Sequence, residues 1–211
     1  MSGEPIVKAP IRTERLELHT VRPEEYLWLP GGERWHDNPG AGPQPSPQLQ
    51  ELWRERGFSN PYRHLIDDPG PLPYRQPRIQ QDPSAAPYLL RWAVHREQRI
   101  IVGSAGFHDL PDGRGMIEIG LGIVPEHQRQ GLARELLVGM WSWVVDQPGV
   151  RVLRYTVSPT NTASQRLIAG FGFAKVGEQM DEVDGLEEIY EGDARQWAKT
   201  QAGSGDGAAT P

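Results

Sequence analysis

Short apolar runs bounded by turn residues follow one another through residues 88–190. Residues 88–96 and 99–110 have the β-branched and aromatic content of strands, and we expect them to form a hairpin. Residues 111–115, Pro-Asp-Gly-Arg-Gly, then turn the chain into a further strand that starts at Met116. The pattern therefore predicts three consecutive strands.

Apolar residues recur every three or four positions in the next segment, as they do on the buried face of an amphipathic helix. This spacing predicts a helix over residues 130–146 with an apolar face of Leu132, Leu136, Leu137, Met140, Trp141 and Val144. A strand over residues 150–157 follows, and then a helix that begins near Asn161. A final hairpin over residues 173–191 turns at Asp184-Gly185, the strongest short turn signal in the chain.

The first part of the chain is less regular. Residues 14–21 alternate as a strand does, and Pro23 is suited to the first turn of a helix. Residues 47–66 predict a helical segment that is broken near Gly57 and Pro61. Together with the later elements, this order predicts a mixed α/β sheet flanked by helices.

Gly and Pro mark the boundaries of the domain. They concentrate in residues 30–47 and 67–87 and in the tail after Thr200. We expect a flexible N-terminus over residues 1–10, a single domain over residues 11–199 and a disordered tail over residues 200–211.

Composition narrows the class of protein. The 211 residues include no cysteine, which excludes disulfides, thiolate metal ligands and a cysteine nucleophile. The net charge of −6 argues against sequence-independent nucleic-acid binding. No apolar run approaches the roughly 20 residues that span a bilayer, and the N-terminus lacks the pattern of a signal peptide, so we expect a cytoplasmic protein.

The junction between the strand at Met116 and the following helix carries the clearest chemical signal. The first turn of a helix leaves about four amide N–H groups without partners and bears a partial positive charge, so it can hold a phosphate. Gly131 and Ala133 are small where the backbone would approach such a ligand, and Arg129 and Arg134 flank the turn.

The spacing Gln128-Arg129-Gln130-Gly131-Leu132-Ala133 resembles Q/R-x-x-G-x-G/A, the pyrophosphate-binding signature of the GNAT superfamily of acyl-CoA-dependent N-acyltransferases. Residues 161–173 resemble a second motif of that family, N-x-x-[SA]-x-x-L-x-x-x-x-G-F. The resemblance implies the GNAT fold, with strands splayed around the acyl-CoA site. It assigns acetyl-CoA to Ile123, Val124, Gln128, Arg129, Gln130, Gly131, Leu132, Ala133, Arg134, Asn161 and Ser164.

The resemblance covers residues 11–190 and is poorest over residues 29–87. The opening Ile-Arg-Thr-Glu-Arg-Leu-Glu-Leu of residues 11–18 is similar to the start of the ribosomal-protein N-terminal acetyltransferase subgroup. Many relatives carry a Tyr where this chain has Ile168, and that Tyr is their usual proton donor to the departing thiolate. The general acid is therefore left unassigned.

In this family an amine attacks the thioester directly, so the protein must accept a proton and stabilise an oxyanion. Glu118 matches the position of the family's proton acceptor, and its alternative is an exposed carboxylate on an alternating strand. His108 ends the preceding strand and could contribute to the acceptor site. By resemblance, a backbone N–H near Val124 is the expected oxyanion donor. We expect His127 to be a solvated or phosphate-side residue, and no histidine has metal spacing, so no metal is predicted.

The sequence leaves three questions open. The chain could be a catalytically silent acyl-CoA sensor or interaction module instead of an enzyme. The acceptor could be a protein N-terminus or a small-molecule amine. Dimers are common for this fold, but no motif requires a homodimer.

Two other signals have plain structural alternatives. Asp181, Glu182 and Asp184 of the last hairpin could attract a cationic acceptor or simply form a solvated face. Trp28, Trp35 and Trp53 could line a pocket, although filling the core is the more common role. A serine hydrolase is disfavoured because Ser104 lacks the G-x-S-x-G spacing.

Overall fold

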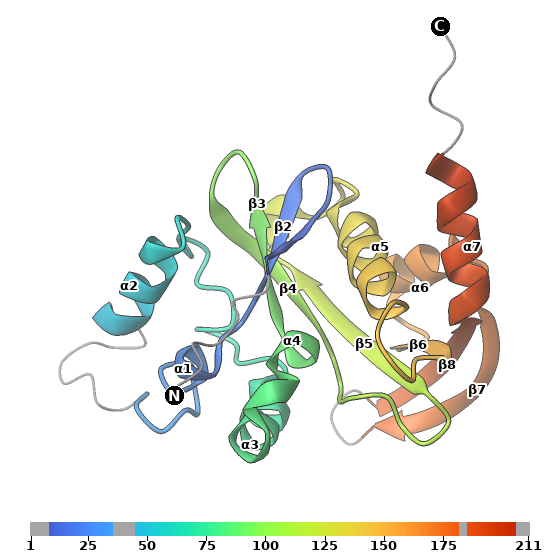
Figure 1. The fold of residues 1–211 in the computed structure, drawn as a ribbon, viewed down its shortest axis with the longest axis horizontal. Helices are drawn as coiled ribbons and strands as arrows, with labels where there is room; N and C mark the ends of the chain where they lie inside the picture. The colour runs from blue at the N-terminus through green and yellow to red at the C-terminus, as the bar shows by residue number, and fades with distance from the viewer. Residues whose placement is uncertain (1–8, 36–44, 182–184, 206–211) are drawn as a thin grey trace, which may run out of the picture.

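The computed structural model describes residues 9–35, 45–181 and 185–205. Within them, eight strands form one sheet in the order β1-β2-β3-β4-β5-β6-β8-β7 (Figure 1). The strands are β1 (Ile11–Arg12), β2 (Leu16–Thr20), β3 (Arg91–His95), β4 (Ile100–Phe107), β5 (Met116–Ile123), β6 (Val152–Val157), β7 (Ala174–Asp181) and β8 (Gly185–Asp193). Neighbours are antiparallel except β5 and β6, which run parallel.

The sheet opens between β5 and β6. Their pairing is confined to Met116–Glu118 against Val152–Arg154, whereas β5 continues beyond Glu118 to Ile123. Residues 119–123 therefore pair with β4 alone. This is the splay that the sequence resemblance implied.

Helices cover both faces of the sheet (Figure 1). One face carries α1 (Pro23–Tyr26), α2 (Pro47–Glu55), α3 (Leu72–Gln81) and α4 (Ala86–Leu89). The other face carries α5 (Leu132–Val144), α6 (Thr162–Ala169) and α7 (Ala194–Gly205). Two 3-10 turns, η1 (Pro83–Ala85) and η2 (Pro125–His127), connect these elements.

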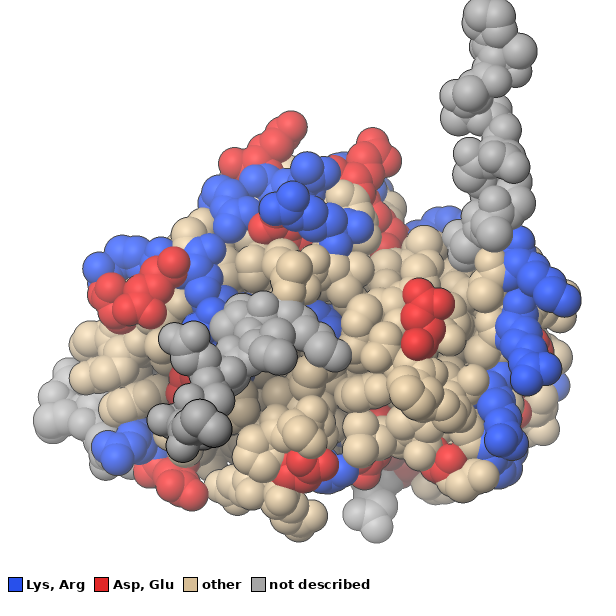
Figure 2. All heavy atoms as spheres, viewed as in Figure 1, with Lys and Arg blue, Asp and Glu red and all other residues tan. Residues whose placement is uncertain are grey.

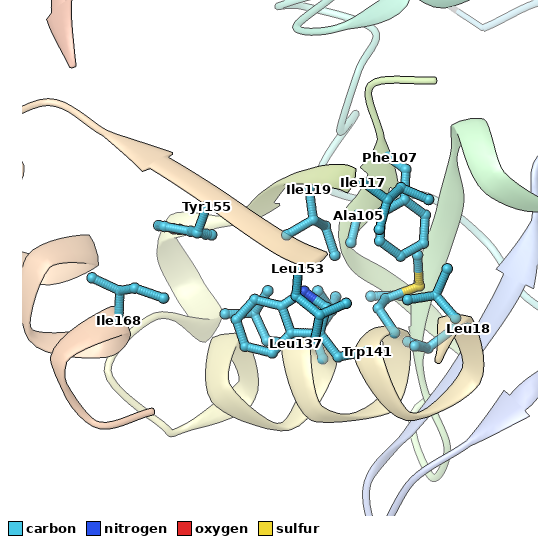
Figure 3. Close-up of a cluster of buried hydrophobic side chains, with 14 of the residues drawn as sticks. Leu18, Ala105, Phe107, Ile117, Ile119, Leu137, Trp141, Leu153, Tyr155 and Ile168 are labelled. Atoms are coloured by element: carbon cyan, nitrogen blue, oxygen red, sulfur yellow. The ribbon is translucent and has the colours of Figure 1, made fainter. Parts of the chain in front are cut away.

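The core on the α5 side confirms the predicted apolar face of that helix. Leu137 and Trp141 of α5 pack against Phe107, Ile117 and Ile119 of the sheet (Figure 3). Each fully buried side chain of this size contributes roughly 1.5–3 kcal/mol through its removal from water. This packing fixes α5, and with it the turn before the helix, relative to β5.

The second core, on the α1–α4 side, is organised around a buried carboxylate. Glu25 is fully buried and accepts hydrogen bonds from Nε1 of Trp53 at 3.1 Å and of Trp92 at 2.9 Å. Its second oxygen accepts from Arg56 at 2.5 Å and from the Arg22 amide at 2.8 Å. Trp53 therefore fills the core, and Trp28 and Trp35 pack against the same cluster.

The structure differs from the sequence prediction at several places. Residues 88 and 89, which we expected to begin a strand, end α4, and β1 was not predicted. The Pro-rich segment after residue 67 contains α3, which we did not predict. The helix can form there because Pro71 and Pro73 occupy its start, where a missing N–H costs nothing. Pro77 lies inside the helix, a position that the sequence argues against. α7 extends to Gly205, into the segment that we expected to be a disordered tail.

Charge is unevenly distributed on the face shown in Figure 2. Lys and Arg side chains line the edge formed by β7 and α7, whereas the surface over α5 is mostly uncharged. Within the described residues, no helix is both long enough and apolar enough to cross a membrane.

Candidate active site

The two faces of β5 have different roles because side chains alternate along a strand. Ile117 and Ile119 point into the core beneath α5. Glu118, Gly120 and Gly122 share the opposite face, toward the α3 side. A cavity of about 430 Å³ lies on that face, and its polar lining includes Tyr62, His64, Arg75, Ser104 and His108 together with the charged Arg63, Asp67 and Asp68.

Glu118 lies where β5 and β6 part. Its Oε1 accepts a hydrogen bond from Thr156 Oγ1 at 2.7 Å, and Nη1 of Arg154 is 4.0 Å from Oε2. The side chain is 12% exposed, so it is not the exposed carboxylate of the structural alternative. A carboxylate held in this way can face an amine that enters from the cavity.

The structure brings the two expected catalytic residues together. Nδ1 of His108 is 3.6 Å from Oε1 of Glu118, and the His108 amide donates to the Glu118 carbonyl at 2.8 Å. Burial lowers the pKa of the His108 imidazole; Glu118 and Asp181 oppose this shift, and Arg75 adds to it. A lowered pKa favours the neutral imidazole, which is the form that can take up a proton.

A second histidine in the cavity escaped the sequence analysis. Nε2 of His64 lies 2.8 Å from Oγ of Ser104, and burial lowers the pKa of His64 to about 4. Asn60 fixes the backbone of His64 through two hydrogen bonds, at 2.9 and 3.0 Å. His64 has no sequence signal, because it lies between two residues in the left-handed conformation, Arg63 and Leu65, outside any regular element.

Two glycines of β5 make room for these imidazoles. A Cβ on Gly120 would lie 3.5 Å from Nε2 of His108, and one on Gly122 would lie 3.6 Å from Cε1 of His64. Both distances are van der Waals contacts, so a side chain larger than a methyl group would enter the cavity. The floor of the cavity is thus bare backbone.

The turn before α5 has the conformation that anion binding requires. Gly131 has φ +82° and Arg129 has φ +58°, both in the left-handed region. In the described part of the chain, the amides of residues 131–134 donate to no protein group, and the first amide to do so is that of Glu135, to the Gly131 carbonyl. These free amides at a helix N-terminus fit a diphosphate.

Arg15 ties this turn to the N-terminal segment and was not singled out from the sequence. Its Nη1 donates to the Gln130 carbonyl at 2.8 Å, and its Nε pairs with Glu135 at 2.7 Å. Burial raises the pKa of Glu135, but hydrogen bonds from Thr13 and Arg15 outweigh it and lower the pKa overall. Glu135 therefore stays ionised and holds Arg15 beside the turn.

The other residues assigned to the turn have distinct roles. Gln128 Nε2 donates to the Ile123 carbonyl at 2.9 Å, and Gln130 Nε2 to the Glu126 carbonyl at 3.1 Å, so both side chains stabilise the loop itself. The side chain of Leu132 is buried in the core, and its amide is one of the free donors of the turn. Ala133 is half-buried.

Arg134 links the turn to the end of the second motif. Its guanidinium carbon lies 4.4 Å from the centre of the Phe171 ring. Asn161 caps α6, because its Oδ1 accepts from the Ser164 amide at 3.1 Å. Ile168 is buried in the core and cannot replace a catalytic tyrosine.

The pairing of β5 decides which of the amides near Val124 are free to act as the expected oxyanion donor. The Val124 amide donates to the Val102 carbonyl at 3.0 Å, so it is engaged within the sheet. Since the His108 amide bonds to the Glu118 carbonyl in the same ladder, the even-numbered residues of β5 direct their amides to β4. The amides of Leu121 and Ile123 therefore point to the side that β6 has left.

His127 also differs from expectation. It is buried, and its Nε2 lies 3.2 Å from the Tyr62 hydroxyl, whereas we expected a solvated or phosphate-side residue. Its pKa is lowered by burial and by His95. Among the described residues, no group of three or more His, Asp or Glu could hold a metal ion.

The last hairpin lies partly outside the described residues, which exclude Glu182 and Asp184. Asp181 interacts electrostatically with His108, so the end of β7 lies near the cavity. Glu188 and Glu191 instead pair with Lys175 at 2.6 Å and Arg154 at 2.6 Å. Much of the acidic run therefore has partners within the domain.

The GNAT acetyltransferase domain model matches residues 48–174. The chain belongs to the GNAT acetyltransferase family, and its splayed mixed sheet is the GNAT fold. The match includes both the turn before α5 and the whole of α6.

Curated relatives match part of the chain. The uncharacterized N-acetyltransferase YoaA of Bacillus subtilis is 35% identical over 89 residues, which cover 42% of this chain and 50% of that protein. The chain thus spans about half the length of the curated relatives that it matches.

Solved structures share the fold over nearly the whole chain. The ribosomal-protein-S5-alanine acetyltransferase of Vibrio fischeri has a TM-score of 0.57 at 14% identity, covering 90% of this chain and 99% of that one. A mutant of the spermidine N-acetyltransferase SpeG of Vibrio cholerae has a TM-score of 0.56 at 13% identity, covering 89% and 98%. At this identity the likeness shows the fold and not the acceptor.

Proposed function

We propose that this protein is an acetyl-CoA-dependent N-acetyltransferase that acetylates a primary amine by direct attack in a ternary complex. The observation that carries the proposal is the position of Glu118 at the parting of β5 and β6. The carboxylate lies beside His108, which lines the cavity, and next to the open edge of β5.

The coenzyme half of the site is supported by free backbone donors. The amides of residues 131–134 suit the diphosphate, and Arg15 and Arg134 add positive charge beside them. The open amides of Leu121 and Ile123 suit the coenzyme's amide-bearing arm and the oxygen of the thioester. Acetyl-CoA would supply the acetyl group as co-substrate.

The acceptor half has a proton acceptor at its entrance. Glu118 takes a proton from the ammonium, directly or through His108, and frees the nitrogen lone pair to attack the thioester carbon. The carbon–nitrogen bond forms, the nitrogen gives up its second proton, and the carbon–sulfur bond breaks. The leaving thiolate takes up one proton, so the net proton released is the one that Glu118 accepted. Both substrates must be held at once, because no residue of this site forms an acyl intermediate in the proposed reaction.

The test is release of free thiol from acetyl-CoA in the presence of a panel of amines. Calorimetry with coenzyme A alone measures the binding step separately. We expect heat of binding and amine-dependent thiol release. Binding without release for any amine would contradict transfer and favour a silent sensor, whereas absence of binding would contradict both.

A further inference from the structure

Arg75 is a buried cation that faces the acceptor cavity without an anionic partner. The side chain projects from α3, is 6% exposed and lines the cavity. Its Nη1 donates to the His108 carbonyl at 3.1 Å, but its Nε is buried and has no hydrogen-bond partner. Among the described residues, no carboxylate oxygen lies within 4.0 Å of the guanidinium.

The nearest carboxylates are already engaged. Tyr26, Asp109 and Glu118 act on Arg75 electrostatically, in that order of size, and they oppose the lowering of its pKa by burial. Asp109 pairs with Arg78 at 2.8 Å, and Glu118 accepts from Thr156. A buried charge without a close counterion is costly, and an anion in the cavity would offset that cost.

A second buried arginine shows what a purely structural role looks like in this protein. Arg91 is 2% exposed, donates to the carbonyls of Pro87 and Leu18 and stacks on Trp143 at 4.5 Å. It does not line the cavity and leaves no buried nitrogen unpartnered. Arg75 differs on both points.

The negative and positive ends of the site are close together. His108 contacts Glu118 through its ring and Arg75 through its carbonyl, so the two charges flank a single residue. Leu65, Leu89 and Leu90 give the same cavity apolar walls. An acceptor that satisfies both ends carries an amine and an anion only a few bonds apart.

We propose that the acceptor is a free amino acid, or a closely similar amino carboxylate with an apolar side chain, whose carboxylate binds Arg75 while its amine faces Glu118 and His108. The inference rests on the proposed acetyl transfer and names its substrate class. A protein N-terminus has no carboxylate next to its amine and would leave Arg75 unpaired. A polyamine would bring a second cation toward Arg75.

The test compares L-leucine with L-leucinamide in the thiol-release assay on the full chain, with spermidine and an alanine-initiated tetrapeptide as further acceptors. The amide has the less basic amine, so the intrinsic reactivity at neutral pH works against the expected result. We expect kcat/KM to be at least about tenfold higher for leucine, since a charge-assisted hydrogen bond is lost with the amide.

Arg75→Gln should abolish this preference by raising KM for leucine by a much larger factor than KM for leucinamide. Arg54→Gln is the control, because Arg54 lies on α2, pairs with Glu51 and does not line the cavity. In a thermal melt with coenzyme A present, leucine should raise the Tm of the wild type and of Arg54→Gln but not of Arg75→Gln.

The outcomes are separable. Thiol release with leucinamide, spermidine or the peptide at least as fast as with leucine would overturn the inference and leave acetyl transfer intact. Absence of release with every amine would overturn the proposed function, and the inference with it. The comparison of leucine with leucinamide uses the wild type, so it decides the question even where Arg75→Gln fails to fold.

Discussion

Thr156 Oγ1 donates a hydrogen bond to Glu118 Oε1 over 2.7 Å, across the point where β6 separates from β5. The bond fixes the carboxylate at the mouth of the splay and leaves its other oxygen with only Arg154, at 4.0 Å. One strand therefore supplies the carboxylate, and its departing neighbour orients it.

Glu118→Gln tests the role of this carboxylate. Loss of a general base typically costs about 10²- to 10⁴-fold, so we expect kcat to fall in that range while the Kd for coenzyme A stays within about twofold. Thiol release and calorimetry measure the two quantities. Glu178→Gln, which alters an exposed carboxylate paired with Lys175, is the control. An unchanged kcat in Glu118→Gln would remove Glu118 from the mechanism.

Gly131→Ala tests the turn before α5. An L-residue in the left-handed region costs roughly 1–2 kcal/mol, and relaxation of φ +82° would rotate the free amides away from a ligand. We expect coenzyme A to bind roughly tenfold more weakly. Gly149→Ala is matched, because Gly149 has φ +85° with open space around it and lies outside the turn. Equal affinity losses in both variants would refute a specific role for the turn.

Glu25→Gln tests the buried charge of the second core. The substitution removes the counterion of Arg56 and turns an amide toward indole donors, so the free energy of unfolding should fall by about 3–5 kcal/mol. Urea denaturation measures it. Glu24→Gln, at the neighbouring half-exposed position, should change stability by less than about 0.5 kcal/mol. A similar small change in Glu25→Gln would contradict this description of the core.

The pH dependence of stability reports on two buried histidines. Burial lowers the pKa of His64 and of His19 to about 4 from 6.5. Between these values the unfolded chain binds more protons, so stability is full above pH 6.5 and is lost as the pH falls toward 4. Each histidine adds a slope of up to about 1.4 kcal/mol per pH unit.

His64→Gln and His19→Gln should each reduce that slope by up to about 1.4 kcal/mol per pH unit, which corresponds to one proton. Urea denaturation at a series of pH values through this window provides the measurement. An unchanged slope in both variants would show that these imidazoles are not held neutral by the fold.

The part of the site that sequence predicted is the part encoded locally. Gly131 and Asn161 act through their own backbone or the next turn, so a short motif is enough to place them. Glu118 and His108 could be paired because a hairpin brings successive strands together. The strands and α5 followed from periodicity, with helix bounds of 132–144 against the predicted 130–146.

The part that sequence missed depends on contacts between distant segments. His64 contacts Ser104 from an irregular loop. Arg75 lies on α3, which the pattern did not predict because prolines occur at its start and inside it. Arg15 meets Gln130 across more than a hundred residues. Burial of His127 against Tyr62 is likewise non-local, so its flanking polar residues suggested the wrong environment. The acceptor side is therefore a product of tertiary packing.

Beyond Glu118, Gly120 and Gly122 put no side-chain carbon on the acceptor side of β5. Each larger side chain at either position would reduce the volume of the cavity, while Glu118 and the turn before α5 kept their positions. The size of the acceptor that fits can thus change in evolution independently of the acetyl-transfer step. Substitutions in β5 alone would thus give close relatives with different acceptor specificities.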